Sequence, residues 1–265
     1  MKSIALKWVY CGLVALASLW PMSARAAGDE AAKDGPAKFA VATIKPSTPD
    51  EPTLVVLIKG NRLTATGTIV ELMKYADGVH PSQVVGGPEW MRTMRFDIVA
   101  DPGTEKRPTS DESKTMVQTL LEDRFHLTEH EEQRELPVFV LVKAKSGPKL
   151  TATKDKPEGL PWVSHGPGGL TAHNASTTDL AKFLQRFVTD KPVVDQTGVA
   201  GRYDMDLEWA PDDLPSGMSA AMKEAVAALP SLYTAIQEQL GLKLEATKQR
   251  VPVMVIDHLE MPGEN

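Results

Sequence analysis

The strongest constraint on the fold of this chain is an internal repeat. Residues 117–142 align without a gap onto residues 232–257, at an offset of 115 positions. The matched pairs include Leu121 with Ile236, Phe125 with Leu240, Leu127 with Leu242, Pro137 with Pro252 and Val140 with Val255. Because these positions follow helical and strand periods and extend beyond hydrophobicity to proline, we interpret the repeat as a tandem duplication rather than a chance match.

Segments upstream match as well. Residues 63–65 (Leu-Thr-Ala) recur as 170–172, and the Arg-aromatic-Asp triplet of residues 95–97 recurs as 202–204, both at an offset of 107. The predicted fold class is therefore α+β, with a unit of strand, helix, two strands, helix and two strands present twice. We expect the two units to pack as pseudo-symmetric halves, with a groove between them as the natural place for a ligand.

Local patterns place the elements of each half. The expected strands are 39–44, 54–59, 62–65, 84–85, 96–100, 127–133 and 137–142, and the expected helices are 68–76, 111–124 and 232–240. Gly60 and Asn61 form a turn dipeptide between two of these strands. Ser219 precedes a run of helix formers at 220–228, which predicts a short extra helix in the second half.

An export signal is predicted at residues 1–26. It has a basic start at Lys2 and Lys7, an apolar run at 8–19 and a small-x-small cleavage site at 24–26. The apolar run is well short of the roughly 20 residues that a membrane-spanning helix needs, so we interpret it as a cleaved signal peptide rather than an anchor. No later segment is apolar enough to span a bilayer. We therefore expect the protein in the periplasm or outside the cell.

The rest of the chain divides by composition. Residues 27–38 are small, charged or proline and predict a flexible leader, and residues 39–150 form the expected first α+β half. Residues 151–168 are expected to be a linker, and residues 169–265 the second half.

Cysteine content and charge limit the partners. The one cysteine, Cys11, lies in the predicted signal, so the exported protein would have neither a disulfide nor a thiolate metal site. Cleavage would remove three basic residues and no acid, so 29 basic residues become 26 against 35 acidic ones and the net charge moves from -6 to -9. This acidity argues against nucleic acid and anionic membranes as partners.

A glycine-containing segment supplies most of the candidate site residues. Asp195, Arg202 and Asp204 could present an arginine and two carboxylates to a polar ligand. In the structural interpretation, Arg202 instead forms an ion pair with an acidic residue of its own fold. We favour this interpretation because the same triplet occurs at 95–97, and interactions that stabilise a fold are duplicated together with it. His258 is the fourth candidate ligand-binding residue, although Asp257 beside it would point to the opposite face of a strand.

Other motifs predict no catalytic residue, no metal and no cofactor. His126 and His130 have the spacing of two ligands on a helix, but the segment reads as a strand, on which they would stand about 13 Å apart. The chain contains no Gly-x-Ser-x-Gly elbow, phosphate-binding glycine loop or dinucleotide fingerprint. Trp90, Trp162 and Trp209 are expected to be core or rim residues.

Several motifs together resemble a known family. They are Gly-Gly-Pro-Glu-Trp at 86–90, Leu-Glu-Asp-Arg-Phe at 121–125, the segment 194–204, Gln-Glu-Gln-Leu-Gly-Leu-Lys-Leu at 237–244 and Val-Ile-Asp-His at 255–258. In combination they look like the soil-associated proteins of acidobacteria, a domain of unknown function, and the similarity runs from about residue 39 to residue 265. The resemblance implies export but no established activity and no catalytic residues.

Three functions are consistent with these observations. The leading hypothesis is a non-enzymatic extracytoplasmic module that binds a small molecule, a peptide or an envelope component. The alternative is a secreted hydrolase of unfamiliar type, in which Asp195 and Asp204 act with His258; it requires these side chains to converge in one cleft, within about 10 Å. A third is a structural surface protein that assembles through an exposed strand edge.

Overall fold

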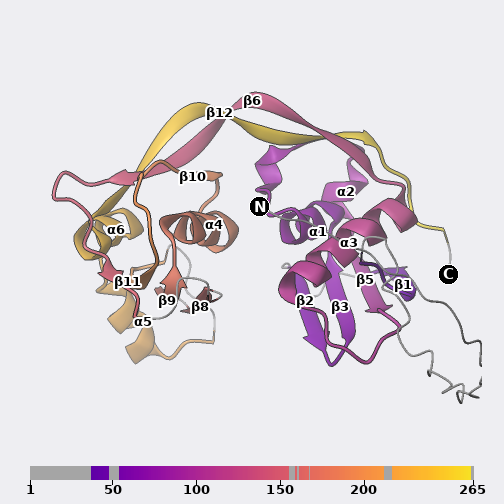
Figure 1. Ribbon diagram of the computed structural model, residues 1–265, viewed down its shortest axis with the longest axis horizontal. Helices are drawn as coiled ribbons and strands as arrows, with labels where there is room; N and C mark the ends of the chain where they lie inside the picture. Colours follow the sequence, from indigo (N-terminus) through magenta and orange to yellow (C-terminus); the bar gives the residue numbers. More distant parts are fainter. Residues whose placement is uncertain are drawn as a thin grey trace, which may run out of the picture. The chain divides into compact units, whose positions relative to one another are not determined.

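The computed structural model describes residues 37–47, 54–154, 159, 161–166, 168–211 and 217–263 (Figure 1). The predicted signal peptide lies outside these residues, as does most of the predicted leader. Within the described ranges the chain is mixed α+β, as predicted, and its strands form three four-stranded sheets. No helix of the described part is both long enough and apolar enough to cross a membrane.

The first sheet has the strand order β1-β5-β3-β2 and is antiparallel throughout. Its strands are β1 (Val41–Pro46), β2 (Val55–Lys59), β3 (Arg62–Gly67) and β5 (Phe96–Asp101). The predicted turn joins β2 to β3, and Gly60 takes the positive φ of 65° that such a turn requires. Alternate residues of β1, β3 and β5 are buried, because one face of the sheet carries the core.

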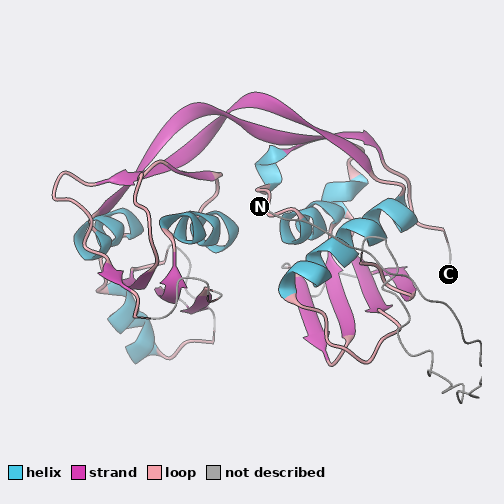
Figure 2. Cartoon of the chain, viewed as in Figure 1, coloured by secondary structure: helices cyan, strands magenta, loops and turns pink. Residues whose placement is uncertain are grey.

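Helices cover that face (Figure 2). The long ones are α1 (Ile69–Ala76) and α3 (Ser110–Phe125), and η1 (Pro81–Gln83), the short strand β4 (Val84–Gly86) and α2 (Trp90–Thr93) lie between them in sequence. Both long helices begin with a capping box, at Thr68 and at Thr109. The threonine side chain accepts a hydrogen bond from the backbone N–H of the glutamate three residues later, and the side chain of that glutamate accepts one from the backbone N–H of the threonine. The predicted helix positions are confirmed.

A second antiparallel sheet has the order β7-β11-β9-β8. It consists of β7 (Thr151–Ala152), β8 (Trp162–Gly166), β9 (Gly169–Ala175) and β11 (Tyr203–Glu208), and α4 (Thr177–Phe187) and α6 (Leu232–Leu240) share its hydrophobic core. The predicted extra helix is α5 (Ala220–Ala227), capped by Ser219. The segment 151–168, expected to be a linker, contributes β7 and β8, because β11 and β9 each offer an edge that another strand can pair with.

A long two-stranded ribbon belongs to both groups of elements (Figure 1). Its strands, β6 (Thr128–Lys143) and β12 (Leu242–His258), pair antiparallel along their whole length. The prediction of two strands in place of β6 was wrong, since residues 134–136 continue the pairing without a break. Pro137 is tolerated inside β6 because only β12 pairs with it there, so the ring nitrogen can face the open edge.

Short parallel strands flank the ribbon. β10 (Val193–Asp195) pairs with β6, and β4 pairs with β12, giving the sheet order β10-β6-β12-β4. The ribbon reaches into both hydrophobic cores: Ile256 packs with the α1 and α3 core, and Phe139 and Leu244 pack with the α4 and α6 core. In the described part of the chain one sheet therefore joins the two larger hydrophobic cores, and a small third cluster of Val138, Val140 and Val251 lies on the ribbon itself.

Candidate functional site

Asp195 holds a turn together. It ends β10 and accepts hydrogen bonds from the hydroxyls of Thr177, Thr178 and Thr197, each at 2.8 Å, and from the Thr197 backbone N–H at 2.9 Å. Partial burial acts to raise the pKa of this carboxyl, but the hydrogen bonds outweigh burial and the pKa is lowered. The carboxylate therefore anchors the start of α4 against β10.

Arg202 pairs with an acid of its own fold, as the structural interpretation expected. Its Nη1 lies 2.8 Å from Oδ2 of Asp179, the acid of the α4 capping box. In the first group of elements Arg95 Nη1 lies 3.0 Å from Oε2 of Glu71, the acid of the α1 capping box. In both places the arginine of the triplet ties the start of a helix to the sheet.

Asp204 also acts locally. Its Oδ1 accepts the backbone N–H of Asn174 at 3.0 Å and lies 3.6 Å from Nδ1 of His173. The hydrogen bond from Asn174, a residue with a positive φ of 52°, is the main cause that lowers the pKa of Asp204. This contact stabilises the irregular end of β9, where its register with β11 shifts.

His258 is far from Asp195. His258 pairs with Thr128 at one end of β6, whereas Asp195 pairs with Leu141 thirteen residues further along the same strand. At about 3.3 Å per residue this separation is roughly 40 Å along the ribbon. The structure does not bring these two side chains together, so the arrangement gives the hydrolase hypothesis no support. As ligand-binding residues the four candidates stay a prediction.

The two histidines of the weak metal motif have separate environments. His126 caps the end of α3 in the left-handed conformation, with a φ of 50°. His130 lies on β6 as expected, with Nδ1 2.9 Å from the Asp257 carboxylate and Nε2 3.3 Å from Oε1 of Glu132. Among the described residues, no three histidine, cysteine, aspartate or glutamate side chains form a group that could hold a metal ion.

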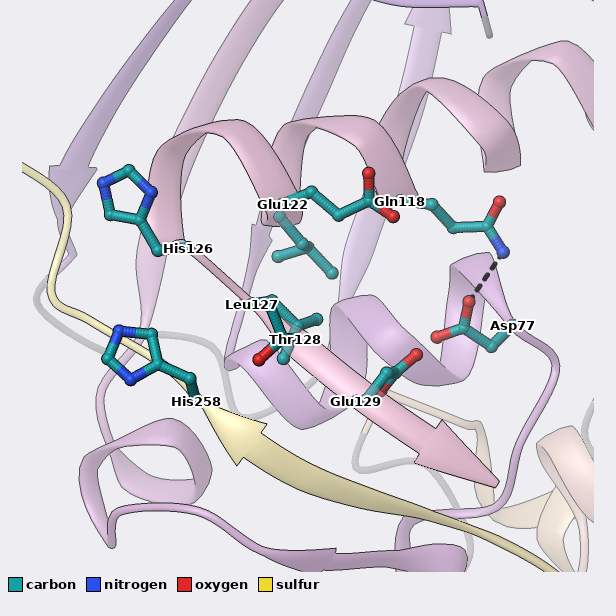
Figure 3. A pocket seen from close by; sticks show the side chains of 9 residues that line it. Asp77, Gln118, Glu122, His126, Leu127, Thr128, Glu129 and His258 are labelled. Atoms are coloured by element: carbon teal, nitrogen blue, oxygen red, sulfur yellow. Dashed lines mark hydrogen bonds between the residues drawn. The ribbon is translucent and has the colours of Figure 1, made fainter.

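A cavity of about 690 Å³ lies where α3 ends and the ribbon begins (Figure 3). Its walls come from the end of α1, one face of α3, the first residues of β6 and the end of β12. The lining residues are Asp77, Gln118, Leu121, Glu122, His126, Leu127, Thr128, Glu129 and His258. All of them belong to the first group of elements and the adjoining end of the ribbon.

Local structure brings these side chains to one place. Gln118, Leu121 and Glu122 share a face of α3 because they are three and four residues apart. The left-handed residue His126 then reverses the chain, so that β6 runs back beside the helix. Glu129 enters the cavity from β6 opposite the end of α1 (Figure 3).

Glu129 is the most perturbed group of this cavity. Its Oε2 is buried and has no hydrogen-bond partner among the described residues. Burial, followed by the nearby charges of Asp77 and Glu122, raises the pKa of Glu129 from an ordinary value of 4.5 to about 7. Burial also raises the pKa of Asp77, although the amide of Gln118 donates to its Oδ1 at 2.7 Å. None of the described residues that line the cavity is a lysine or an arginine.

Imidazoles occupy the other end of the cavity, away from Asp77 and Gln118 (Figure 3). Both rings approach Glu260: His258 Nε2 lies 2.9 Å from Oε1, and His126 Nε2 lies 4.0 Å from Oε2. The cavity thus has two different ends. One end contains carboxyl groups and little positive charge, and the other contains two imidazoles that already face the Glu260 carboxylate.

Sequence reasoning placed His258 among the candidates but missed Glu129. A signal was present, because residue 129 aligns with residue 244 in the internal sequence match, where the chain has a leucine that is 5% exposed.

The fold and the cavity define a mixed α+β protein built on one long ribbon, with a recess large enough for a small molecule. Residues 70–259 match the family described as a protein of unknown function, DUF3738. This match spans well over half of the chain, so the protein belongs to that family. Comparison with curated proteins and with solved structures finds no match. The resemblance to soil-associated proteins of acidobacteria stays a prediction.

Proposed function

We propose that this protein is an exported, non-enzymatic binding module, formed by tandem duplication, which holds a small amine-bearing ligand in the Glu129 cavity. The observation that carries the proposal is the buried, unpartnered carboxylate oxygen of Glu129 inside a cavity of ligand size. The predicted export signal at residues 1–26 supports an extracytoplasmic location.

The pairing registers support the duplication. Leu63 pairs with Ala100 in the first sheet, and Leu170 pairs with Leu207 in the second, both members being shifted by 107 residues. In the ribbon, Glu135 pairs with Arg250, and residue 250 is also the position that aligns with residue 135 in the sequence repeat, at the offset of 115. A residue that pairs with its own copy lies where a twofold axis would cross an antiparallel ribbon.

The duplication separates structural residues from the cavity residues. The helix-capping ion pair recurs, as Glu71 with Arg95 and as Asp179 with Arg202. The cavity acids do not recur: Glu129 aligns with a leucine, and Asp77 aligns with a glutamine at the helix offset of 108. Since features needed for folding are kept in both copies, the acids of one copy are better explained by a ligand.

Charge and size together favour an amine. A protonated amine would give Glu129 Oε2 the partner that it lacks and would offset the repulsion from Asp77 and Glu122. A cavity of about 690 Å³ is far larger than a single ion needs and suits a small organic molecule. Leu121 and Leu127 give the apolar part of such a ligand a surface to contact.

The proposal is tested by calorimetric titration of the purified full chain with putrescine, spermidine, lysine and arginine at neutral pH. We expect at least one amine to bind and Glu129→Gln to weaken it by about tenfold or more, since a charge-assisted hydrogen bond is lost. Glu131→Gln, an exposed glutamate two residues along β6, is the matched control and should leave the affinity unchanged. Equal affinities of the wild type and Glu129→Gln, or no binding at about 10 mM amine, would contradict the proposal.

A further inference from the structure

A second cavity, of about 450 Å³, lies in the other group of elements and is lined with aromatic rings. Phe183 and Phe187 come from one face of α4 and His165 comes from β8. Their ring centroids are close together, 4.6 Å for His165 and Phe187 and 5.1 Å for the two phenylalanines. Tyr233, at the start of α6, and Trp209, just after β11, complete the aromatic lining.

Two of these rings are unusually exposed. Phe187 is 52% exposed and Tyr233 is 51% exposed, although both line a recess with a buried tryptophan. Leaving this much aromatic surface in water costs free energy that burial in the core would avoid. Several exposed aromatic side chains around one recess are typical of a binding site, whereas exposed apolar residues without such a role are usually scattered singly over the surface.

Trp209 adds a hydrogen-bond donor to the cavity. The residue is only 6% exposed, and its indole N–H makes no hydrogen bond with any described residue. The indole N–H is not itself buried from solvent, so it is accessible to a ligand oxygen that approaches the ring. His165 contributes ring nitrogens that can donate or accept.

The charges around this cavity are already balanced, in contrast to those around Glu129. The carboxylate of Asp190 lies 2.8 Å from Nζ of Lys191. The guanidinium carbon of Arg186 lies 5.1 Å from the centroid of the Phe187 ring, so a cation already occupies one face of that ring. Among the described residues that line the cavity, Asp190 is the only aspartate or glutamate, and there is no lysine or arginine. The cavity therefore favours a neutral ligand.

We propose that this second cavity binds a neutral saccharide. A pyranose ring has an apolar face that can stack on the exposed rings of Phe187 and Tyr233, and hydroxyls that can accept from the indole of Trp209 and bond to His165. The volume suits roughly one or two sugar rings. This site is independent of the Glu129 cavity, and neither proposal needs the other.

The test is a calorimetric titration of the full chain with four neutral trisaccharides: cellotriose, xylotriose, mannotriose and N-acetylchitotriose. At least one should bind, and Phe187→Ala should weaken it by about tenfold because a stacking surface is lost. Phe187 is half exposed, so this variant is expected to fold. Trp209→Phe keeps the packing of a large ring, removes the indole N–H and should weaken binding by about fivefold.

Two controls locate the effect. Trp162→Ala removes an exposed aromatic residue that stacks on His173 outside this cavity, and Glu129→Gln changes the other cavity. Both variants should bind the saccharide as the wild type does. The proposal is overturned if none of the four saccharides binds at about 10 mM, or if the affinity of the best one is unaffected by both Phe187→Ala and Trp209→Phe. Amine binding at Glu129 is measured separately, so failure of either proposal can be told from failure of the other.

Discussion

Replacing Glu129 with glutamine should stabilise the folded protein at alkaline pH and leave its stability unchanged at acidic pH. The folded-state pKa of about 7 is above the ordinary value of 4.5, so the folded protein holds this proton more tightly than the unfolded chain does. Below pH 4.5 both states are protonated and the group makes no difference. As the pH rises from 4.5 through 7, the unfolded chain releases its proton first and stability is lost.

The size of the effect follows from the same pKa values. Each pKa unit corresponds to about 1.4 kcal/mol, so the whole difference between 4.5 and about 7 corresponds to about 3.5 kcal/mol as an upper limit. Glu129 is only partly buried, and solvent screening reduces the effect, so we expect about 1 to 2 kcal/mol. The amide of glutamine has nearly the same shape and cannot ionise, so the variant removes this cost alone.

The assay is urea unfolding of the wild type and Glu129→Gln at several values between about pH 4 and about pH 8.5, with the midpoint and slope compared at each. The difference in unfolding free energy should be near zero at the acidic end and grow to favour the variant at the alkaline end. Glu131→Gln, at an exposed position, should show no such trend. Parallel stability curves for the wild type and Glu129→Gln would refute the reasoning, because they would mean that the Glu129 carboxyl has the same pKa in both states.

Two further predictions concern structural features that occur in both groups of elements. Arg95→Met should lower the unfolding free energy by about 3 kcal/mol and Arg202→Met by about 1 kcal/mol, because the Arg95 side chain is 8% exposed and that of Arg202 is 31% exposed. Urea unfolding measures both, and equal losses would contradict the role of burial. His126→Gly should raise the unfolding free energy by about 1 kcal/mol, because glycine adopts the left-handed backbone conformation of this position without the steric cost that histidine has. Gly241→Ala should lower it by about 2 kcal/mol, because an added Cβ would meet the backbone of Gly147 and Lys149. Thermal unfolding of the two variants should therefore give shifts of opposite sign, and shifts of the same sign would count against this account.

Much of the local structure could be read from the sequence. The capping threonines, the Gly60 turn and the helix after Ser219 were predictable because each depends on residues within a few positions of one another. The boundary inside β6 was predicted wrongly, because the charged residues Arg134 and Glu135 and the proline at 137 interrupt the β pattern. They stay in a strand because β12 pairs with them across the ribbon.

The functional residues were harder to predict. Arg202 was given a structural interpretation because its triplet occurs twice, and its contact with Asp179 agrees with that interpretation. His258 was selected for a neighbour, Asp257, which instead contacts His130 across the ribbon. The carboxyl groups of the cavity, those of Asp77, Glu122 and Glu129, come from three separate elements, so no single sequence motif contains them.

The sequence by itself determined where the main helices and most of the strands form, because propensity, capping and hydrophobic period are properties of short segments of the chain, whereas the continuity of β6 and the strands β7 and β8 depend on pairing partners distant in the chain. Its internal repeat also predicted that like segments would take like conformations, and both aligned helices end in a left-handed residue, His126 and Gly241. The tertiary structure alone decided which side chains share a cavity. Glu129 acquires its raised pKa from burial and from Asp77, 52 positions away in the chain, since desolvation and Coulomb interactions depend on distance through space rather than along the sequence.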